Sequence, residues 1–331
     1  MSGGGQVQFQ ERHKNKLRHI IADSLAEARK SLIPRGLTVS RMNHIEKLKR
    51  LTPEGLHPHL GALRRRLRTM AVRTRRQRQR LLDDPALETK DRELLKQVGT
   101  RISAGDGMYT GDGAHYYKVG LSAIRAIEKA IDAAQLGSVR RILDLPCGHG
   151  RVLRFLVRRF PQAEITACDL DRKGVNFCAR AFGTKALYSD PSLDQFSATG
   201  QFDLIWCGSL ITHLNDTGIR ALLAFFARHL RPDGLLIFTA HGERVIQRLR
   251  DQEFEYGIAL ESIAPIIEAY RKEGFGFADY SGASAYGVSL TSREWIRRAA
   301  AQIGLQEVYF RARGWDDHQD VYGFILQNLN L

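Results

Sequence analysis

The segment 141–154 (RILDLPCGHGRVLR) has the residue types and the spacing of a site for a nucleotide-like ligand. An apolar run ends in Asp144, and a Gly-x-Gly turn follows at Gly148 and Gly150. Because glycine has no Cβ, such a turn at the end of a strand lets polar groups of a ligand approach backbone N–H groups closely. A dinucleotide-binding fingerprint would have a third glycine where this chain has Leu153, so the segment does not favour a nicotinamide cofactor.

Polar residues also follow the next three apolar runs. The run 164–169 ends in Asp169, which precedes Leu170, and the run 185–188 leads into Ser189 and Asp190. The run 202–207 is followed by the loop 208–213 (GSLITH). Because the carboxyl ends of parallel strands meet at one edge of a sheet, we expect these residues to line one crevice.

The order of these motifs resembles that of class I S-adenosylmethionine-dependent methyltransferases. In that family the first acidic residue and the glycine turn lie along the amino-acid part of the cofactor. The acidic residue after the second strand bonds the ribose hydroxyls, and the one after the third reaches the adenine amino group. The resemblance implies S-adenosyl-L-methionine as the cofactor and no metal. The residues that it assigns to the cofactor are Asp144, Pro146, Cys147, Gly148, Gly150, Asp169, Leu170, Ser189, Asp190, Gly208 and Ser209.

The resemblance continues on the methyl side of the expected site. The loop 208–213 matches the family segment that faces the methyl group, and 230–238 (LRPDGLLIF) matches the helix–turn–strand that follows. The segments 106–111, 116–120, 144–154, 208–213 and 318–323 together resemble a bacterial group of methyltransferases associated with cell-surface glycan genes. This finer resemblance implies that the methyl acceptor is a sugar or a glycan precursor.

Methyl transfer to a hydroxyl needs a group that takes the proton, and an imidazole titrates near neutrality. His213, in the loop after 202–207, is the first candidate for this base. His241, just past 235–240, and His318 are the other two, and packing or a helix end is the alternative role for each. Aromatic candidates for the wall of the acceptor pocket are Trp206, Tyr286 and Trp315, with core packing as the alternative.

Alternating strand and helix patterns position these residues. Strands are expected at 141–145, 164–169, 185–188, 202–207 and 235–240, and helices at 117–134, 150–160, 172–182 and 216–230. An insertion at about 243–285 precedes a strand-like run 286–290, a helix 292–303 and two β-rich runs, 306–312 and 321–327. We therefore expect an α/β domain over 101–331, with a doubly wound, mostly parallel, seven-stranded Rossmann-like sheet and an antiparallel edge.

Residues 1–100 are expected to form a basic, mainly helical N-terminal extension, since they show no alternating strand pattern. They hold 23 Lys and Arg against 10 Asp and Glu, nearly all of the chain's formal net charge of +14. Within them, 63–80 has nine arginines in eighteen residues. This density favours a polyanionic partner, and a solvated helix face is the alternative. An anionic membrane surface and RNA would satisfy the charge equally well, but 63–80 has no aromatic residues that could stack bases, which slightly disfavours single-stranded RNA.

Other function classes stay open beside sugar O-methylation. One is an RNA or ribosome-associated methyltransferase whose basic arm docks nucleic acid, although no Asn/Asp-Pro-Pro-Tyr/Phe motif follows 202–207. Another is a non-catalytic nucleotide-binding protein, against which the intact cofactor motifs count. No apolar run approaches the roughly 18 residues that span a bilayer, so we expect a cytoplasmic protein that is peripheral at the inner membrane face if it meets a membrane.

Overall fold

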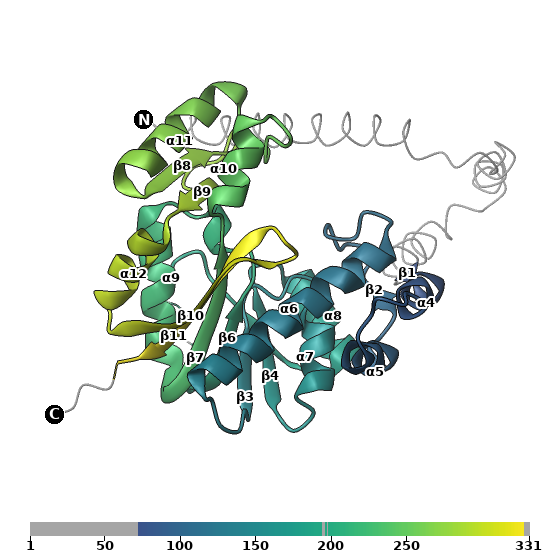
Figure 1. Cartoon of the computed structure of the whole chain (residues 1–331). Coiled ribbons are helices and arrows are strands. Elements are labelled where there is room, and N and C mark those ends of the chain that lie inside the picture. Colours follow the sequence, from purple (N-terminus) through teal and green to yellow (C-terminus); the bar gives the residue numbers. More distant parts are fainter. Residues whose placement is uncertain (1–71, 194–195, 197, 328–331) are drawn as a thin grey trace, which may run out of the picture. The chain divides into compact units, whose positions relative to one another are not determined.

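A seven-stranded sheet with helices on both faces forms the body of the molecule (Figure 1). The computed structural model describes residues 72–193, 196 and 198–327, which all lie in the compact unit Arg68–Leu331. The strands are β3 (Arg141–Asp144), β4 (Glu164–Asp169), β5 (Lys185–Tyr188), β6 (Phe202–Cys207), β7 (Leu230–Ala240), β10 (Leu305–Trp315) and β11 (Gln319–Leu326). Their order is β10-β11-β7-β6-β3-β4-β5.

Five neighbouring strands of this sheet, β5 to β7 in the sheet order, run parallel. Strand β11 runs antiparallel to both of its neighbours, β7 and β10. The expected fold class, a mostly parallel Rossmann-like sheet with an antiparallel edge, is therefore confirmed. The chain moves from β3 toward β4 and β5 on one side and toward β6 and β7 on the other, so the strand order reverses at β3, where open α/β sheets bind ligands.

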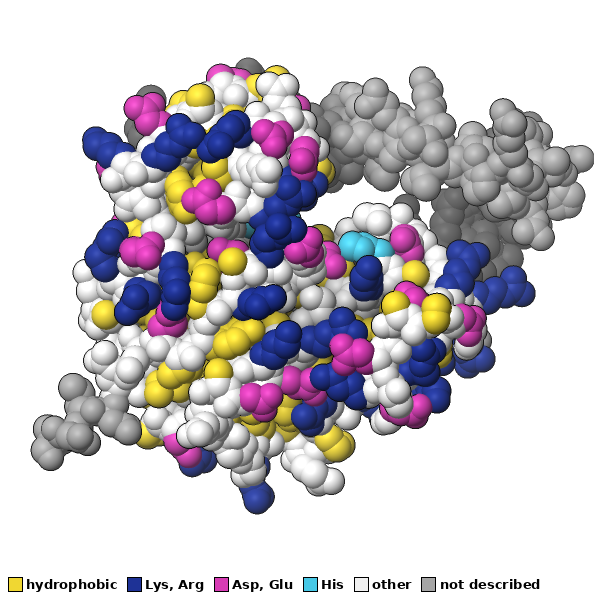
Figure 2. Space-filling view, viewed as in Figure 1, with side chains coloured by type: hydrophobic (Ala, Val, Ile, Leu, Met, Phe, Trp, Pro, Cys, Tyr) yellow, Lys and Arg dark blue, Asp and Glu magenta, His cyan; other side chains and the backbone are white. Residues whose placement is uncertain are grey.

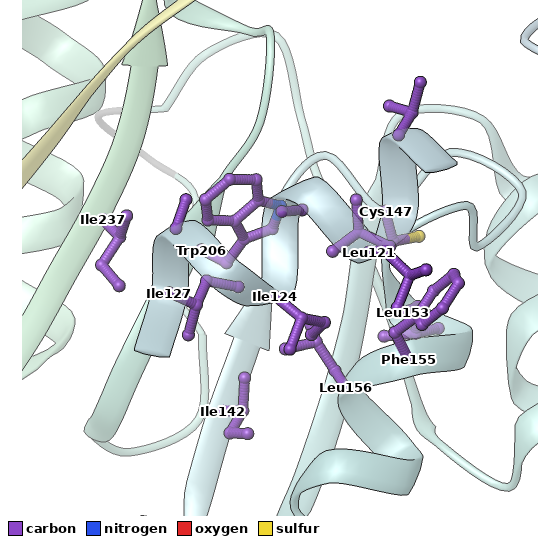
Figure 3. Close-up of a cluster of buried hydrophobic side chains, with 14 of the residues drawn as sticks. Leu121, Ile124, Ile127, Ile142, Cys147, Leu153, Phe155, Leu156, Trp206 and Ile237 are labelled. Carbon is purple, nitrogen blue, oxygen red and sulfur yellow. The ribbon is translucent and has the colours of Figure 1, made fainter. Parts of the chain in front are cut away.

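Alternation along the strands creates two apolar faces, each covered by helices. The cluster on one face joins α6 (Gly113–Ala134), α7 (Leu153–Arg159) and α8 (Arg172–Phe182) to the sheet. In Figure 3, Ile127 of α6 lies beside Trp206 of β6, and Leu121 of the same helix lies beside Cys147 and Leu153. The other face is covered by α9 (Asp216–His229) and α12 (Arg293–Ala301). Because both faces of the sheet are covered, all six residues of the central strand β6 are buried.

The expected insertion forms a small unit with a core of its own, which we call the cap (residues 243–291). It contains α10 (Glu243–Arg250), α11 (Leu260–Glu273), β8 (Phe275–Asp279) and β9 (Gly287–Thr291). Eight apolar side chains of the cap, among them Val245, Ile266 and Leu290, are buried together. The strand expected at 286–290 pairs with β8 inside the cap, not with the main sheet. The cap stands at the carboxyl ends of the parallel strands (Figure 1).

The described part of the N-terminal hundred residues packs on the same body. It contains β1 (Val72–Arg73), α4 (Arg75–Leu82) and α5 (Thr89–Gln97), and β1 pairs with β2 (Arg101–Ile102), which follows directly. Leu81, Leu82, Leu95 and Val98 are buried in the cluster under α6, so packing begins before the boundary that we expected at residue 100. Residues 1–71 of the expected extension lie outside the described residues, and the division into domains stays a prediction. No helix in the described ranges is long and apolar enough to cross a membrane.

Candidate active site

A cavity of about 960 Å³ opens at the carboxyl ends of the parallel strands. Its walls come from the turn after β3, the segments that follow β4, β5 and β6, and the cap residues 284–286. This position is where ligands of open α/β sheets bind, and the volume has room for a nucleotide-sized molecule and a small second ligand. The predicted convergence of the strand ends on one crevice is therefore observed.

Asp144 is the most unusual residue of this wall. It is 1% exposed, and neither carboxylate oxygen has a hydrogen-bond partner within the described residues. Burial, and then the negative charge of Asp169, raise the pKa of Asp144 well above its ordinary value. A buried carboxylate without a donor is costly, so Asp144 favours a cationic or donor group in the cavity beside it.

The turn after Asp144 is open toward the cavity at Gly148. This glycine has a φ of +49°, and a Cβ placed on it would meet no atom within 4 Å. Gly150 is different, because a Cβ there would lie 2.6 Å from the ring of Phe182 in α8. Gly150 therefore allows α8 to pack closely on the turn. It is absent from the cavity wall, where we expected it as a cofactor contact.

Asp169 anchors the turn from the end of β4. Its Oδ2 accepts a hydrogen bond from the Gly148 N–H at 2.8 Å, and its Oδ1 accepts one from the Asp171 N–H at 2.9 Å. Each carboxylate oxygen has a second lone pair, so both can still accept from a ligand. Leu170 beside it is 57% exposed and lines the cavity.

Most of the residues predicted from the sequence lie on this wall. Ser189 and Asp190 line it after β5, where Asp190 also accepts a hydrogen bond from the Ser192 N–H at 2.8 Å. Ser209 lines it after β6 and has a φ of +60°. The predicted residues that line the cavity are Asp144, Pro146, Cys147, Gly148, Asp169, Leu170, Ser189, Asp190, Gly208, Ser209 and His213, together with the aromatic residues Trp206, Tyr286 and Trp315. Their roles toward a ligand stay predictions.

His213 ends a short 3₁₀ helix, Ile211–His213, on the cavity wall. Its Nδ1 lies 3.1 Å from the carbonyl oxygen of Gly287 and 2.8 Å from the hydroxyl of Tyr280, both in the cap. In the tautomer that carries its proton on Nδ1, the ring donates to the Gly287 carbonyl and the lone pair lies on Nε2. Burial lowers the pKa of His213, an effect that the bond to Gly287 opposes. The ring is therefore suited to accept a proton at neutral pH.

The other two histidines lie away from the cavity wall. His241 is 4% exposed, its Nδ1 has no hydrogen-bond partner within the described residues, and burial lowers its pKa well below the ordinary value. His318 stacks on Tyr256 of the cap with ring centres 5.7 Å apart. Burial, and then the charges of Arg248 and Arg244, lower the pKa of His318 to about 4. Among the three predicted bases, only His213 is placed to meet a ligand.

Three charged residues of the wall, Asp106, Arg151 and Asp171, were missed as site residues. Asp106 reaches the cavity from the loop before α6 and is 8% exposed. Arg151 follows the glycine turn directly, and its guanidinium lies 5.6 Å from the ring centre of Trp315. Its neighbour Arg154 is fully buried and donates to backbone carbonyls, including that of Gly150 at 2.9 Å. The position of Arg151 next to the glycine turn could have marked it as a site residue. The sequence alone does not show that Arg151 faces the cavity and that the nearby Arg154 does not.

Comparison with known proteins shows which proteins the chain is similar to. Residues 142–234 match the family model described as a methyltransferase domain. The malonyl-[acyl-carrier protein] O-methyltransferase of Bacillus cytotoxicus is 29% identical over 110 residues, which are 33% of this chain and 38% of that protein. The fatty-acid O-methyltransferase of Mycolicibacterium smegmatis is 31% identical over 102 residues, which are 30% of this chain and 36% of that protein.

The chain thus spans about two fifths of the length of the curated relatives it matches. Among solved structures, an S-adenosylmethionine-dependent methyltransferase from Clostridium acetobutylicum aligns with a TM-score of 0.45 and 17% identity. That alignment covers 64% of this chain and 92% of the other.

Proposed function

We propose that this chain, whose residues 142–234 form a methyltransferase domain of the class that uses S-adenosylmethionine, transfers a methyl group from that cofactor to a hydroxyl oxygen of a small acceptor. The observation that carries the proposal is the buried Asp144 carboxylate, which has no partner in the described residues and faces the cavity beside the open turn at Gly148. When bound, the cofactor supplies a methyl group on a positively charged sulfonium. A cation is what an unpaired buried carboxylate favours, so the residues present fit this group.

The neighbouring residues fit the rest of the cofactor. The free lone pairs of Asp169 can accept hydrogen bonds from the two hydroxyls of a ribose. The exposed Leu170 gives an apolar surface for an adenine ring, and Asp190 can accept from its amino group. These assignments rest on the position of each residue on the cavity wall and on its unused hydrogen-bonding capacity.

The acceptor is proposed to bind between the loop after β6 and the cap, with its hydroxyl at Nε2 of His213. That nitrogen makes no hydrogen bond within the described residues, so its lone pair is available to take the hydroxyl proton. The surrounding wall combines an aromatic ring, Tyr286, with polar side chains, Asn215 and Ser284. A mixture of this kind suits a sugar or a glycan precursor, and the sugar acceptor remains our proposal.

Replacing His213 tests the proposal. We expect His213→Ala to lower turnover of a hydroxyl acceptor by about 10²- to 10⁴-fold, the usual contribution of a general base. The dissociation constant for S-adenosylhomocysteine, measured by titration calorimetry, should change little. The matched control is His318→Ala, because His318 lies off the cavity wall. Full turnover in the His213 variant would remove it from this role.

The choice of acceptors separates the proposal from a close alternative. The relatives are named for acceptors that bear a carboxyl group, malonyl-acyl-carrier protein and fatty acid. A carboxylate at neutral pH has no proton to remove, so its methylation would not depend on His213. Assays with sugars, fatty acids and malonyl thioesters therefore separate the two acceptor classes. If the acceptor is a hydroxyl, the His213→Ala variant loses activity on it. If the acceptor is a carboxylate, the variant keeps its activity. Absence of S-adenosylhomocysteine binding by the wild-type chain would contradict both.

A second proposal concerns the arginine-rich segment 63–80, of which residues 63–71 lie outside the described residues. In α4, Arg75, Arg76 and Arg80 are exposed and form no ion pair within the described ranges, and Figure 2 shows Lys and Arg side chains gathered over this region. Arg78 is not available, since it donates to the Lys96 and Val98 carbonyls at the end of α5. We propose that the exposed arginines dock a polyanion, with a membrane surface favoured over RNA, in a cytoplasmic protein.

Binding to anionic phospholipid vesicles and to RNA tests this second proposal. The charge-reversal variant Arg75→Glu/Arg76→Glu/Arg80→Glu should lose vesicle binding, whereas reversal of the exposed Arg158 on α7 should not. Loss of RNA binding with unchanged vesicle binding would favour RNA. Equal binding by the variant and the wild type to both would exclude α4 as the docking surface.

A further inference from the structure

Two arginines of the cap, Arg244 and Arg248, lie one turn apart on the same face of α10, and we call them the arginine pair. Both guanidinium groups lie 3.3 Å from a single carboxylate oxygen, Oε2 of Glu253. One carboxylate carries one negative charge, so this partner leaves one positive charge of the pair unneutralised. The two side chains are 27% and 28% exposed, which allows a ligand to reach them from solvent.

The remaining contacts of the arginine pair are long. Arg244 lies 3.5 Å from the side-chain oxygen of Gln247, and Arg248 lies 3.3 Å from the Tyr256 hydroxyl and 3.5 Å from Nδ1 of His318. Charge-assisted hydrogen bonds in proteins are usually about 2.7–2.9 Å long. In addition, Nε of Arg248 is buried and makes no hydrogen bond within the described residues. Both guanidinium groups therefore keep donor capacity that an anionic ligand can use.

His241 is a second group beside the pair with an unused nitrogen. Its ring centre lies 5.3 Å from that of Tyr256 and 5.8 Å from that of His318. The side chain is 4% exposed, and its Nδ1 has no partner in the part of the chain that the structure describes. Buried polar groups without a partner are few in folded proteins, and they often mark a place where a ligand or water binds. Two such nitrogens, one from Arg248 and one from His241, lie in this cluster.

The arginine pair lies next to the cavity but not on its wall. His318, which contacts Arg248, donates its backbone N–H to the Trp315 carbonyl at 3.0 Å, and the following residue, Gln319, donates to the Ser209 hydroxyl at 2.9 Å. Trp315 and Ser209 both line the cavity. Figure 2 shows Lys and Arg side chains at this junction of the cap and the β10–β11 hairpin. A ligand held by the pair can therefore extend into the cavity.

We propose that the arginine pair binds a phosphate group carried by the methyl acceptor. This inference rests on the proposed function, because the hydroxyl of the same acceptor then lies at His213. Two guanidinium groups offer more donors than the one carboxylate between them can accept, and a phosphate has three or four oxygens that suit their planar geometry. A sugar phosphate and a nucleotide-linked sugar both contain this group. Phe254, which is 53% exposed and 5.3 Å from the Arg248 guanidinium, offers a flat surface on which a nucleobase can stack.

Titration calorimetry with glucose, glucose 1-phosphate and UDP-glucose tests the site. The chain is first saturated with S-adenosylhomocysteine, so that the cofactor end of the cavity is filled. We expect both phosphate compounds to bind and glucose to bind at least about tenfold more weakly. Arg244→Ala and Arg248→Ala should each weaken the phosphate compounds by about 10- to 100-fold, the effect of losing hydrogen bonds to a charged group, and leave S-adenosylhomocysteine within about twofold.

Phe254→Ala separates the two sources of the phosphate. If the acceptor is a nucleotide-linked sugar, UDP-glucose should bind more tightly than glucose 1-phosphate, and this advantage should disappear in the Phe254 variant. If the acceptor is a sugar monophosphate, the two compounds should bind alike, and the variant should not distinguish them.

Arg250→Ala is the matched control. Arg250 belongs to the same helix but to another face, is exposed, and makes no ion pair within the described ranges, so its variant should bind every compound as the wild type does. Arg248→Lys should recover part of the affinity, since it keeps the charge without the planar fork, and thermal unfolding midpoints check that each variant is folded.

Two results would overturn the site: wild-type phosphate binding in both alanine variants of the pair, or no binding of either phosphate compound by a wild type that binds S-adenosylhomocysteine. Failure of the wild type to bind S-adenosylhomocysteine would instead refute the proposed function. In that case the dependence of phosphate binding on the arginine pair would still decide whether the pair is a phosphate site.

Discussion

His213 is held by residues that are more than sixty positions away in the sequence. The Gly287 carbonyl and the Tyr280 hydroxyl, both from the cap, contact its Nδ1, while Nε2 has no bond within the described residues. The cap therefore holds the ring in its orientation through two contacts to the same nitrogen. Burial lowers the pKa of His213 and so keeps the ring neutral under conditions in which an exposed histidine would begin to protonate.

This lowered pKa predicts the pH profile of the reaction. The base is active when His213 is neutral, which is the case at every pH above its pKa. We expect kcat/KM for a hydroxyl acceptor to stay level from about pH 8 down to about pH 6.5, the ordinary histidine value, and to fall only at lower pH. Binding of S-adenosylhomocysteine over the same range serves as the control. A decline in kcat/KM that is centred above pH 7 would contradict the assignment.

At the scale of elements, helix α8 fixes the turn that forms the cofactor end of the cavity. A Cβ at Gly174 in its first turn would lie 2.3 Å from the Gly148 carbonyl oxygen, and Gly150 allows the ring of Phe182 to approach from the same helix. The turn and the helix therefore pack with backbone in contact. Gly148 makes both contacts: its carbonyl oxygen packs on Gly174, and its N–H donates to Asp169. A shift of the helix would therefore also disturb the hydrogen bond to Asp169.

Gly174→Ala is expected to displace the turn that contains Gly148, although Gly174 itself does not line the cavity. Backbone must shift to accept the methyl group, so the free energy of unfolding should fall by about 1–3 kcal/mol, as for other overpacked sites, and S-adenosylhomocysteine affinity should fall with it. Gly137→Ala is a suitable control, because a Cβ there meets no atom within 4 Å. Denaturant titration and calorimetry measure the two effects. Wild-type values for both would show that the contact is not tight.

At the scale of the whole molecule, the β10–β11 hairpin joins the sheet to the cap. His318, near the tip of the hairpin, stacks on Tyr256 and lies 3.5 Å from the Arg248 guanidinium, both of which belong to the cap. Protonation of His318 would place a second positive charge beside Arg248. The lowered pKa of His318, about 4, expresses the same repulsion together with burial.

The stability of the fold should therefore depend on His318 as the pH falls. Its pKa in the folded chain is about 4, below the unfolded value of about 6.5, so the unfolded state binds the extra proton first. The contribution of His318 is full above about pH 6.5 and is lost progressively toward pH 4. In urea titrations across this range, we expect the wild type to lose stability more steeply than His318→Phe, which keeps the stacked ring but cannot titrate. Parallel curves would show that His318 titrates alike in both states.

Local patterns in the sequence determined most of the architecture of the sheet. The strands 164–169, 185–188 and 202–207 and the helix 172–182 were predicted with the bounds that the structure has. Such segments can be predicted because the spacing of their apolar residues and the residues that begin and end a helix or strand lie within the segment itself. The convergence of Asp144, Asp169 and Asp190 on one crevice follows from the same information, since parallel strands bring their carboxyl ends together.

Only the tertiary structure decided which of the candidate residues face the cavity. His213 lies on its wall while His241 and His318 do not, Gly148 is open to it while Gly150 packs on Phe182, and Arg151 lacks a partner while Arg154 is saturated by backbone carbonyls. In each pair the residue type is the same, so composition and spacing cannot separate the two. The difference arises from contacts with segments far away in the chain, and those contacts exist only once the chain has folded.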